Sequence, residues 1–515
     1  MSVPHPKPEL ERFISQGDAF LLGSHLHDWR QAESAYEEAY RLLRTDEIRR
    51  KLALTRFLIM TREIDLDIPN PTMTETIGML CTDLKTERDK ALCGIALWYK
   101  GGAVAGAREE QAVVTNGKIA DTAFDRTNSA LDAYLYLLFS RAYGLGDPPP
   151  GWEEISGRFK DSPLFIYLDF GRRGLRDADR LRGTFPTFAE MFEFLGELLF
   201  QKKQYNAARG DFRKAVELIP DFTRARNGIG NIYLFALEDF DRALEWYESS
   251  LKYDPTNVAA LYGRGLVLHQ LGKYEESISA LDAMLQIDLS RKPRMDASGA
   301  RYYQGEAYYL KAHDFYLLKK PDRARGFVDR AKTLLPDSED INYLSGLLYY
   351  EAADQEAARG DFLRVMEMGT SNAAAQYYLG LIYHERKGTL EDPHVATPQM
   401  PRGESYDKLM KYLSELPAEK EPAEAKALNY FLGASSAMAG MARTITDQIN
   451  SIPALDLEPN EKVVLKGRLE KKLFEHRVLS AARIEAMINV ISDDDIPARQ
   501  NYVNLMTEIL SGIRP

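Results

Sequence analysis

Few residues of this chain combine the types and the spacing that catalysis requires. His25 and His27 stand two positions apart and could share a stray metal ion, but this spacing is also typical of a surface pair near a turn. The segment 433–436 (Gly-Ala-Ser-Ser) lacks the closing glycine of a nucleophile elbow, and no strand is predicted before it. Gly117-Lys118 lacks the leading glycine and the hydroxyl of a phosphate-binding loop. We therefore predict that the chain is not an enzyme and has no catalytic residue, metal site or cofactor.

The two cysteines, Cys81 and Cys93, are twelve residues apart, a spacing that matches no zinc or redox motif. Both fall on expected helices beside Leu80 and Leu92, so we interpret them as small buried hydrophobic residues. Two cysteines are too few for a disulfide framework that holds a chain of this length together. The sequence leaves their redox state open.

Composition indicates an ordinary globular chain. Its 515 residues suggest roughly two to four domains or one long repeat array, and 45% hydrophobic with 28% charged residues excludes wholesale disorder. Acidic residues outnumber basic ones by 77 to 66. The resulting net charge of −11 argues against a nucleic-acid backbone or an anionic membrane as the main partner.

The location of the protein is predicted from what the chain start and the apolar segments contain. No run of 18 apolar residues occurs, so we expect no integral membrane segment. The first residues, MSVPHPKPELERF, contain neither the basic nor the apolar region of a signal peptide, which predicts a cytoplasmic protein. If an export signal has been removed, the periplasm is the alternative.

Internal repeats determine the expected fold. The segments 207–212 and 357–362 are identical in sequence, and between them a fixed order of residues returns. In 189–222 the order begins with Gly196 and continues with a large apolar residue three positions after it. Ala208 stands twelve positions after Gly196, and Pro220 stands twelve positions after Ala208. The same order, with small insertions, recurs over 223–257, 258–291, 298–338 and 339–372, and the segment 376–383 opens a sixth copy.

This pattern resembles the tetratricopeptide repeat, a 34-residue helix–turn–helix unit. The small residue on the first helix lets the second helix approach closely, and the proline ends the second helix. The resemblance implies an all-α fold in which helix pairs stack into an α-α superhelix, a solenoid with divergent helical flanks. We therefore expect an N-terminal, repeat-like helical region over 1–183, the array over 184–386, a loop-rich insertion over 387–423 and a C-terminal helical cap over 424–515.

The same resemblance implies which side chains face the concave side, because the first helix of each repeat turns positions 5 and 12 inward. Position 5 carries Tyr262, Tyr302, Tyr343 and Tyr377, position 12 carries His269, Tyr309, Tyr350 and His384, and an earlier repeat carries Asn227 and Asn231. Tyrosine offers a large contact area at low entropic cost, which suits peptide binding. The family's carboxylate clamp needs a lysine and an asparagine on one helix and an asparagine on the next helix, where this chain has Gly263. That lysine is missing here, so we do not expect binding of chaperone C-terminal tails.

These observations predict a non-enzymatic scaffold that binds a partner protein or peptide in the groove of a tetratricopeptide array. The alternative is an exported, periplasmic or lipoprotein-like component of an envelope or transport system that has a small-molecule pocket. In the helix expected at 424–450, Gly433, Ala437 and Met441 share a face that permits close helix contact. Capping of the array explains this face, and homo-oligomer formation is the alternative.

Overall fold

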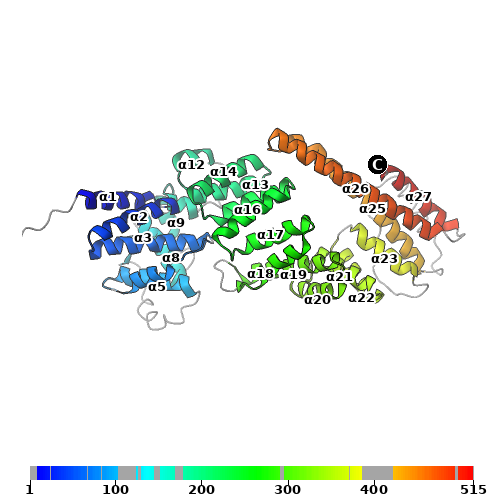
Figure 1. The fold of residues 1–515 in the computed structure, drawn as a ribbon, viewed down its shortest axis with the longest axis horizontal. Coiled ribbons are helices and arrows are strands. Elements are labelled where there is room, and N and C mark those ends of the chain that lie inside the picture. Colours follow the sequence, from blue (N-terminus) through cyan, green and yellow to red (C-terminus); the bar gives the residue numbers. More distant parts are fainter. Residues whose placement is uncertain are drawn as a thin grey trace, which may run out of the picture. The chain divides into compact units, whose positions relative to one another are not determined.

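Helices make up the whole of the regular structure that can be described. The computed structural model describes residues 8–23, 25–66, 68–82, 84–101, 123–125, 129–143, 151–168, 178–289, 295–369, 372–385, 422–492 and 497–513. Every regular element within these ranges is a helix, which confirms the predicted all-α fold (Figure 1). The expected insertion over 387–423 lies outside the described residues, apart from its last two positions.

Contacts divide the chain into two compact units. The first unit consists of Met1–Ala236, Asp241–Gly263 and Arg291–Arg294, and the second of Leu237–Phe240, Arg264–Ser290 and Met295–Pro515. Helix α17 (Val258–Gln270) contains the boundary between Gly263 and Arg264. Each unit is therefore described separately below.

The first unit begins with pairs of antiparallel helices. Its described helices are α1 (Pro8–Gly23), α2 (Leu26–Leu42), α3 (Asp46–Asp65), α4 (Met73–Cys81), α5 (Glu87–Gly101), α8 (Ala130–Tyr143), α9 (Trp152–Arg158), α10 (Pro163–Leu168), α12 (Ala178–Thr184), α13 (Ala189–Gln201), α14 (Tyr205–Leu218), α15 (Thr223–Asn231), η1 (Ile232–Ala236) and α16 (Phe240–Tyr253). Local sequence specifies where some of them start. Thr45, for example, precedes α3, and its side chain accepts a hydrogen bond from the Ile48 backbone nitrogen at 3.3 Å.

Glycines mark where the two helices of a pair touch. A Cβ atom on Gly196 of α13 would lie 2.8 Å from the ring of Phe212 on α14. A Cβ on Gly17 of α1 would lie 2.6 Å from the ring of Tyr36 on α2. No real side chain tolerates such distances. The first two helices of the chain therefore make the same contact as the repeat at 189–222, and α1 and α2 lie side by side (Figure 1).

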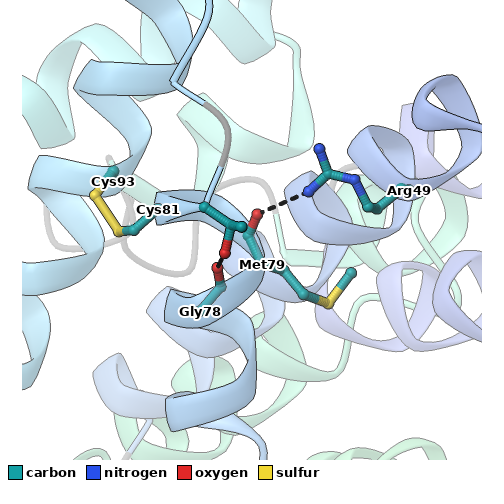
Figure 2. Close-up of a disulfide and its surroundings, with 6 residues drawn as sticks. Arg49, Gly78, Met79, Cys81 and Cys93 are labelled. Carbon is teal, nitrogen blue, oxygen red and sulfur yellow. Dashed lines mark hydrogen bonds between the residues drawn. A yellow bond between two sulfur atoms is a disulfide. The ribbon is translucent and has the colours of Figure 1, made fainter.

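A disulfide joins α4 to α5, which corrects our interpretation of the cysteines as separate buried residues. Cys81 and Cys93 are bonded, with their Cα atoms 5.1 Å apart (Figure 2). Cys93 is buried and Cys81 is half-buried. Nearby, the Arg49 Nη1 atom donates a hydrogen bond to the backbone oxygen of Met79 at 3.2 Å, which ties α3 to α4. A twelve-residue spacing suits two antiparallel helices joined by a short turn, a geometry that no cysteine motif encodes.

A buried ion pair connects the N-terminal helices to the first repeat. Arg62 of α3 and Glu190 of α13 have no exposed side-chain surface, and Arg62 Nη1 lies 2.9 Å from Glu190 Oε1. The guanidinium carbon of Arg62 is 3.7 Å from the ring centre of Tyr167 and 5.1 Å from that of Trp29. Aromatic faces and a carboxylate therefore replace water around this charge.

The second unit continues the helix pairs and ends in three helices, of which the first two have 30 and 34 residues. Its further helices are α18 (Tyr274–Leu285), α19 (Ala297–Leu317), α20 (Pro321–Leu334), α21 (Glu339–Glu351), α22 (Gln355–Glu367), α23 (Ala373–Glu385), α25 (Pro422–Ser451), η3 (Ile452–Ala454), α26 (Pro459–Ser492) and α27 (Pro497–Ile513). Pro321 starts α20 at a position where its missing N–H costs nothing.

Helix α25 occupies the place of a second repeat helix beside α23. A Cβ on Gly380 would lie 2.5 Å from the ring of Phe431, just as a Cβ on Gly346 would lie 2.7 Å from the ring of Phe362. Leu379 is fully buried in a core cluster to which α25 contributes. The sixth repeat is thus completed after a long insertion, and α26 and α27 cover the far side of α25 with a second apolar cluster.

Candidate partner-binding surface

Three successive first helices of the second unit carry the predicted tyrosines. Helix α19 holds Tyr302 and Tyr309, α21 holds Tyr343 and Tyr350, and α23 holds Tyr377. In α19 and in α21 the two tyrosines are seven residues apart, which is close to two helical turns, so both lie on the same face of their helix. We call these five residues the tyrosine face.

The tyrosine face is open at α19 and packed at its other end. Tyr302 is 51% exposed, whereas Tyr343 and Tyr377 are half-buried. The ring centre of Tyr343 lies 6.0 Å from that of Phe362, and the ring centre of Tyr377 lies 6.4 Å from that of Phe431. Tyr302 is therefore the member of this face most accessible to a partner.

Hydroxyl and carboxylate groups accompany the rings at the α21 and α23 end. Tyr350 donates a hydrogen bond to Glu385 at 3.3 Å, and its ring centre lies 5.0 Å from that of Tyr378. Burial and the Glu385 carboxylate raise the pKa of Tyr350 to about 12, so its hydroxyl keeps its proton at neutral pH. Burial likewise raises the pKa of Tyr343 to about 12. These hydroxyls remain hydrogen-bond donors throughout the physiological range.

The predicted His269 belongs to a buried polar cluster. Its Nδ1 atom lies 2.6 Å from Oδ1 of Asp314, whose side chain is fully buried. The ring of His313 is centred 4.9 Å from the ring of His269, and Tyr309 stands 6.0 Å from His313. Burial, and the neighbouring His269, lower the pKa of His313 to about 4. Histidine at position 12 here joins α17 to α19.

The remaining predicted residues have separate surroundings. Tyr262 is half-buried and belongs to the first unit, and His384 is half-buried near the end of α23. Asn227 is 7% exposed and donates to the Asn257 side chain at 3.0 Å. Asn231 accepts a hydrogen bond from the Tyr247 hydroxyl at 2.6 Å. The two asparagines thus join neighbouring helices of the first unit.

Sequence reasoning overlooked Tyr378, His313 and Arg483 as neighbours of the tyrosine face. Tyr378 stacks on Phe362 with ring centres 5.4 Å apart, and the charge of Arg483 on α26 lowers the pKa of Tyr343 and Tyr378 against the effect of burial. The adjacency of tyrosines 377 and 378 in the sequence could have indicated that a second ring lies near this face. The position of Arg483 near these tyrosines depends on the packing of α26, and no local sequence pattern predicts it.

The described part of the chain offers little to other kinds of site. Within it, no group of three or more His, Cys, Asp or Glu residues could hold a metal ion. No described helix has the length and apolarity needed to cross a bilayer. A shallow cavity of about 280 Å³ opens between α25, α26 and α27, lined by Arg443, Arg477 and Glu508 among others.

Comparison with known proteins supports the repeat assignment. The family model described as tetratricopeptide repeat matches residues 189–222, and a second model of the same description matches residues 232–291. These ranges contain α13 with α14 and the three helices from α16 to α18, and they include the contacts of Gly196 with Phe212 and of Gly265 with Leu281.

Relatives and solved structures show partial similarity. The DnaJ homolog subfamily C member 7 homolog of Schizosaccharomyces pombe is 26% identical over 268 residues, 47% of this chain and 52% of the relative. BBSome complex member BBS4 of Bos taurus is 22% identical over 252 residues, 45% of this chain and 47% of the relative. The chain thus spans about half the length of these two relatives.

A structure described as a functional characterization of Pseudomonas aeruginosa pilF covers 38% of this chain and 82% of its own, with 19% identity and a TM-score of 0.34. The repeated spacing, the glycine contacts between paired helices and the two family matches agree with one another. The chain therefore contains tetratricopeptide repeats, which family models match over residues 189–222 and 232–291.

Proposed function

We propose that this protein is a non-enzymatic interaction scaffold and that a partner protein or peptide binds on the tyrosine face of α19, α21 and α23. The observation that supports this proposal is Tyr302, a large aromatic residue that is 51% exposed at the open end of a row of otherwise packed tyrosines. A half-exposed aromatic ring offers a bound peptide both apolar contact area and a hydroxyl for hydrogen bonding.

The chemistry of the tyrosine face suits a peptide backbone with apolar side chains. Ring faces provide contact area, and hydroxyls such as that of Tyr309 can bond backbone carbonyls. Glu351 and Glu385 already accept hydrogen bonds from Tyr316 and Tyr350, so the carboxylates along this face are partly satisfied within the unit. Neutral or basic peptide segments should therefore bind better than strongly acidic ones.

Replacement of Tyr302 by alanine tests the proposal. Partners are first captured from the source organism with the wild-type chain, and the captured partner is then titrated against Tyr302→Ala. We expect an affinity loss of about tenfold or more, the size of an aromatic hot spot, with an unchanged melting temperature. The control is Tyr253→Ala on α16, because Tyr253 is 44% exposed but lies on the second helix of its repeat. Equal affinity for Tyr302→Ala and wild type would place the binding surface elsewhere.

A second candidate function follows from the disulfide. Disulfides persist in oxidising compartments and are rare in reducing ones, so the Cys81–Cys93 bond favours the exported alternative over a cytoplasmic location. In that case the same scaffold operates in the cell envelope. Alkylation of thiols under denaturing conditions, in protein taken directly from its native cells, tests this. A cytoplasmic protein would be labelled at both cysteines without prior reduction, and an exported one would not.

A further inference from the structure

Small side chains form the shallow cavity where α25, α26 and α27 pack together. Ala439 and Ala442 line it from α25, and Gly512 lines it from α27. A Cβ placed on Gly512 would meet nothing within 4 Å, so the missing side chain keeps the cavity open. Ile509 and Ile513 complete an aliphatic floor, which is continuous with the apolar cluster that the three helices share. The cavity is therefore a recess in a packed core.

Two arginines meet at this recess. Arg443 lines it from α25 and Arg477 lines it from α26. Neither side chain forms a hydrogen bond or an ion pair with another residue that the structure describes. Two like charges repel each other, and an anion placed between them removes that repulsion. The two arginines therefore indicate an anion as the occupant of the recess.

Arg477 is held in the wall of the cavity. The residue before it, His476, fixes α26 against α25, since its Nε2 atom lies 2.9 Å from the backbone oxygen of Met438. The Nε atom of Arg477 is buried and has no partner among the described residues, so the stem of this side chain is packed and its Nη atoms are the ones that can reach a ligand. A cation that is already ordered loses less entropy when it binds.

The surroundings of the two arginines specify the class of anion. Glu508 of α27 also lines the cavity, so two positive charges and one negative charge meet there. A singly charged anion balances this excess, whereas a phosphate group carries nearly two negative charges at neutral pH. A planar carboxylate matches the forked donors of a guanidinium group, and the aliphatic floor suits an apolar chain attached to it.

The volume of the cavity limits the size of the ligand. At about 280 Å³ it lies just below the usual range of ligand pockets. At roughly 30 Å³ per non-hydrogen atom, the share of a water molecule, it holds about nine atoms, as in a carboxylate with about seven carbons.

We propose that this cavity binds a small aliphatic monocarboxylate. The carboxylate lies between Arg443 and Arg477, and the aliphatic chain covers the floor beside Gly512. None of these residues belongs to the tyrosine face, so the site is independent of the proposed scaffold function. A free organic acid and the C-terminus of a polypeptide that ends in an aliphatic residue share this chemistry.

Titration of the full chain with heptanoate, followed by saturation-transfer NMR of the ligand, tests the proposal. We expect a Kd of about 1 mM or lower, which ligands of this size can reach. Heptan-1-ol and heptylamine have the same chain without the negative charge and should bind at least about tenfold more weakly. N-acetylleucine distinguishes the two sources of the carboxylate, because it resembles a polypeptide C-terminus and should bind more tightly than heptanoate only if such a terminus is the ligand.

Charge variants show whether the arginines hold the carboxylate. Arg477→Gln should weaken heptanoate binding by about tenfold or more. Lys471→Gln is the matched control, because Lys471 lies on the same helix with a side chain that is 76% exposed, and it does not line the cavity. Glu508→Gln should strengthen binding by about twofold or more, because it removes a like charge beside the carboxylate.

Gly512→Leu tests the cavity itself. The new side chain fills the space above the aliphatic floor, so heptanoate binding should be lost. Gly467→Leu on α26 is the matched control, because a Cβ on Gly467 also meets nothing within 4 Å but this residue does not line the cavity. Thermal melts followed by circular dichroism confirm that each variant is folded.

Three results would overturn the proposal. Heptanoate could fail to bind at about 20 mM, far above the expected Kd. Heptan-1-ol could bind as tightly as heptanoate, which would indicate apolar adhesion without a carboxylate site. Finally, heptanoate binding that persists unchanged in both Arg477→Gln and Gly512→Leu would place the ligand elsewhere on the chain.

Discussion

The two units of this protein stabilise their helices by different means. In the first unit, a fully buried arginine and glutamate join α3 to α13, and a disulfide joins α4 to α5. In the second unit, the contact between α21 and α22 is apolar and depends on shape, since Phe362 occupies the space left by Gly346. The glycine contact also occurs in the first unit, where Phe212 occupies the space left by Gly196, so the buried ion pair and the disulfide are additions to the steric fit that both units share. The two kinds of contact should respond differently to mutation and to solvent.

The largest effect is expected from Glu190→Ala in the first unit. This change leaves the Arg62 charge buried without a counter-charge, at a cost of about 3–5 kcal/mol in the free energy of unfolding. Urea denaturation measures it, with Glu245→Ala at an exposed position of the same unit as the control. Replacement of both Arg62 and Glu190 by methionine should recover much of the loss. An unchanged urea midpoint for Glu190→Ala would show that Arg62 finds another partner.

Reduction of the disulfide should have the next largest effect. Cross-linking residues twelve positions apart restricts the unfolded chain by about 3 kcal/mol, so dithiothreitol or Cys81→Ala with Cys93→Ala should destabilise the first unit by that amount. The second unit contains no cysteine and should not respond. If both units lose stability equally on reduction, the two units unfold together and the comparison fails.

Gly346→Leu should disturb the second unit through shape alone. The new side chain overlaps Phe362, and overpacking of this kind costs about 1–3 kcal/mol. Gly360→Leu on α22 is the matched control, because a Cβ on Gly360 meets nothing within 4 Å and leucine favours the helix. The melting temperature of Gly346→Leu should lie below that of the wild type, and the melting temperature of Gly360→Leu should equal or exceed that of the wild type. The reverse order would contradict the glycine contact.

The smallest effect is the change of stability with pH that the polar cluster of His269, Asp314 and His313 should cause in the second unit. His313 has a folded-state pKa of about 4, below its unfolded value near 6.5, so the unfolded state binds more protons between these values. Stability should therefore be full above pH 6.5 and should fall by about 2 kcal/mol on acidification to pH 5. His313→Asn should flatten this dependence relative to wild type. A slope that persists in the variant would assign the titration to another group.

Much of the repeat structure could be predicted because its contacts are local. Gly196 and Phe212, and likewise Gly346 and Phe362, are sixteen residues apart (212 − 196 and 362 − 346), so one helix hairpin brings them together. In the sixth repeat, Gly380 and Phe431 make the same contact, but they are 51 residues apart in the sequence. The interruption of the spacing hid that pair, although the residue types were the same.

The tyrosine face shows where such prediction stops. Position in the repeat placed Tyr302, Tyr343 and Tyr377 on first helices, and the structure has them there. Their unequal exposure could not be foreseen, because it depends on Phe362 and Phe431 from the helices packed beside them. Asn227 and Asn231 illustrate the same limit, since side chains of neighbouring helices, Asn257 and Tyr247, form hydrogen bonds with them inside the first unit.

The sequence by itself determined the helical fold, the repeat period and the small residues at helix contacts, because these follow from spacing within about 40 residues. Only the tertiary structure decided that Arg62 meets Glu190 across 128 residues. It also decided that Arg443 and Arg477 line the same cavity. The physical reason is the same in each case. Burial and pairing are properties of which helices pack together, and a periodic sequence specifies the local hairpin more strongly than it specifies the neighbours of that hairpin.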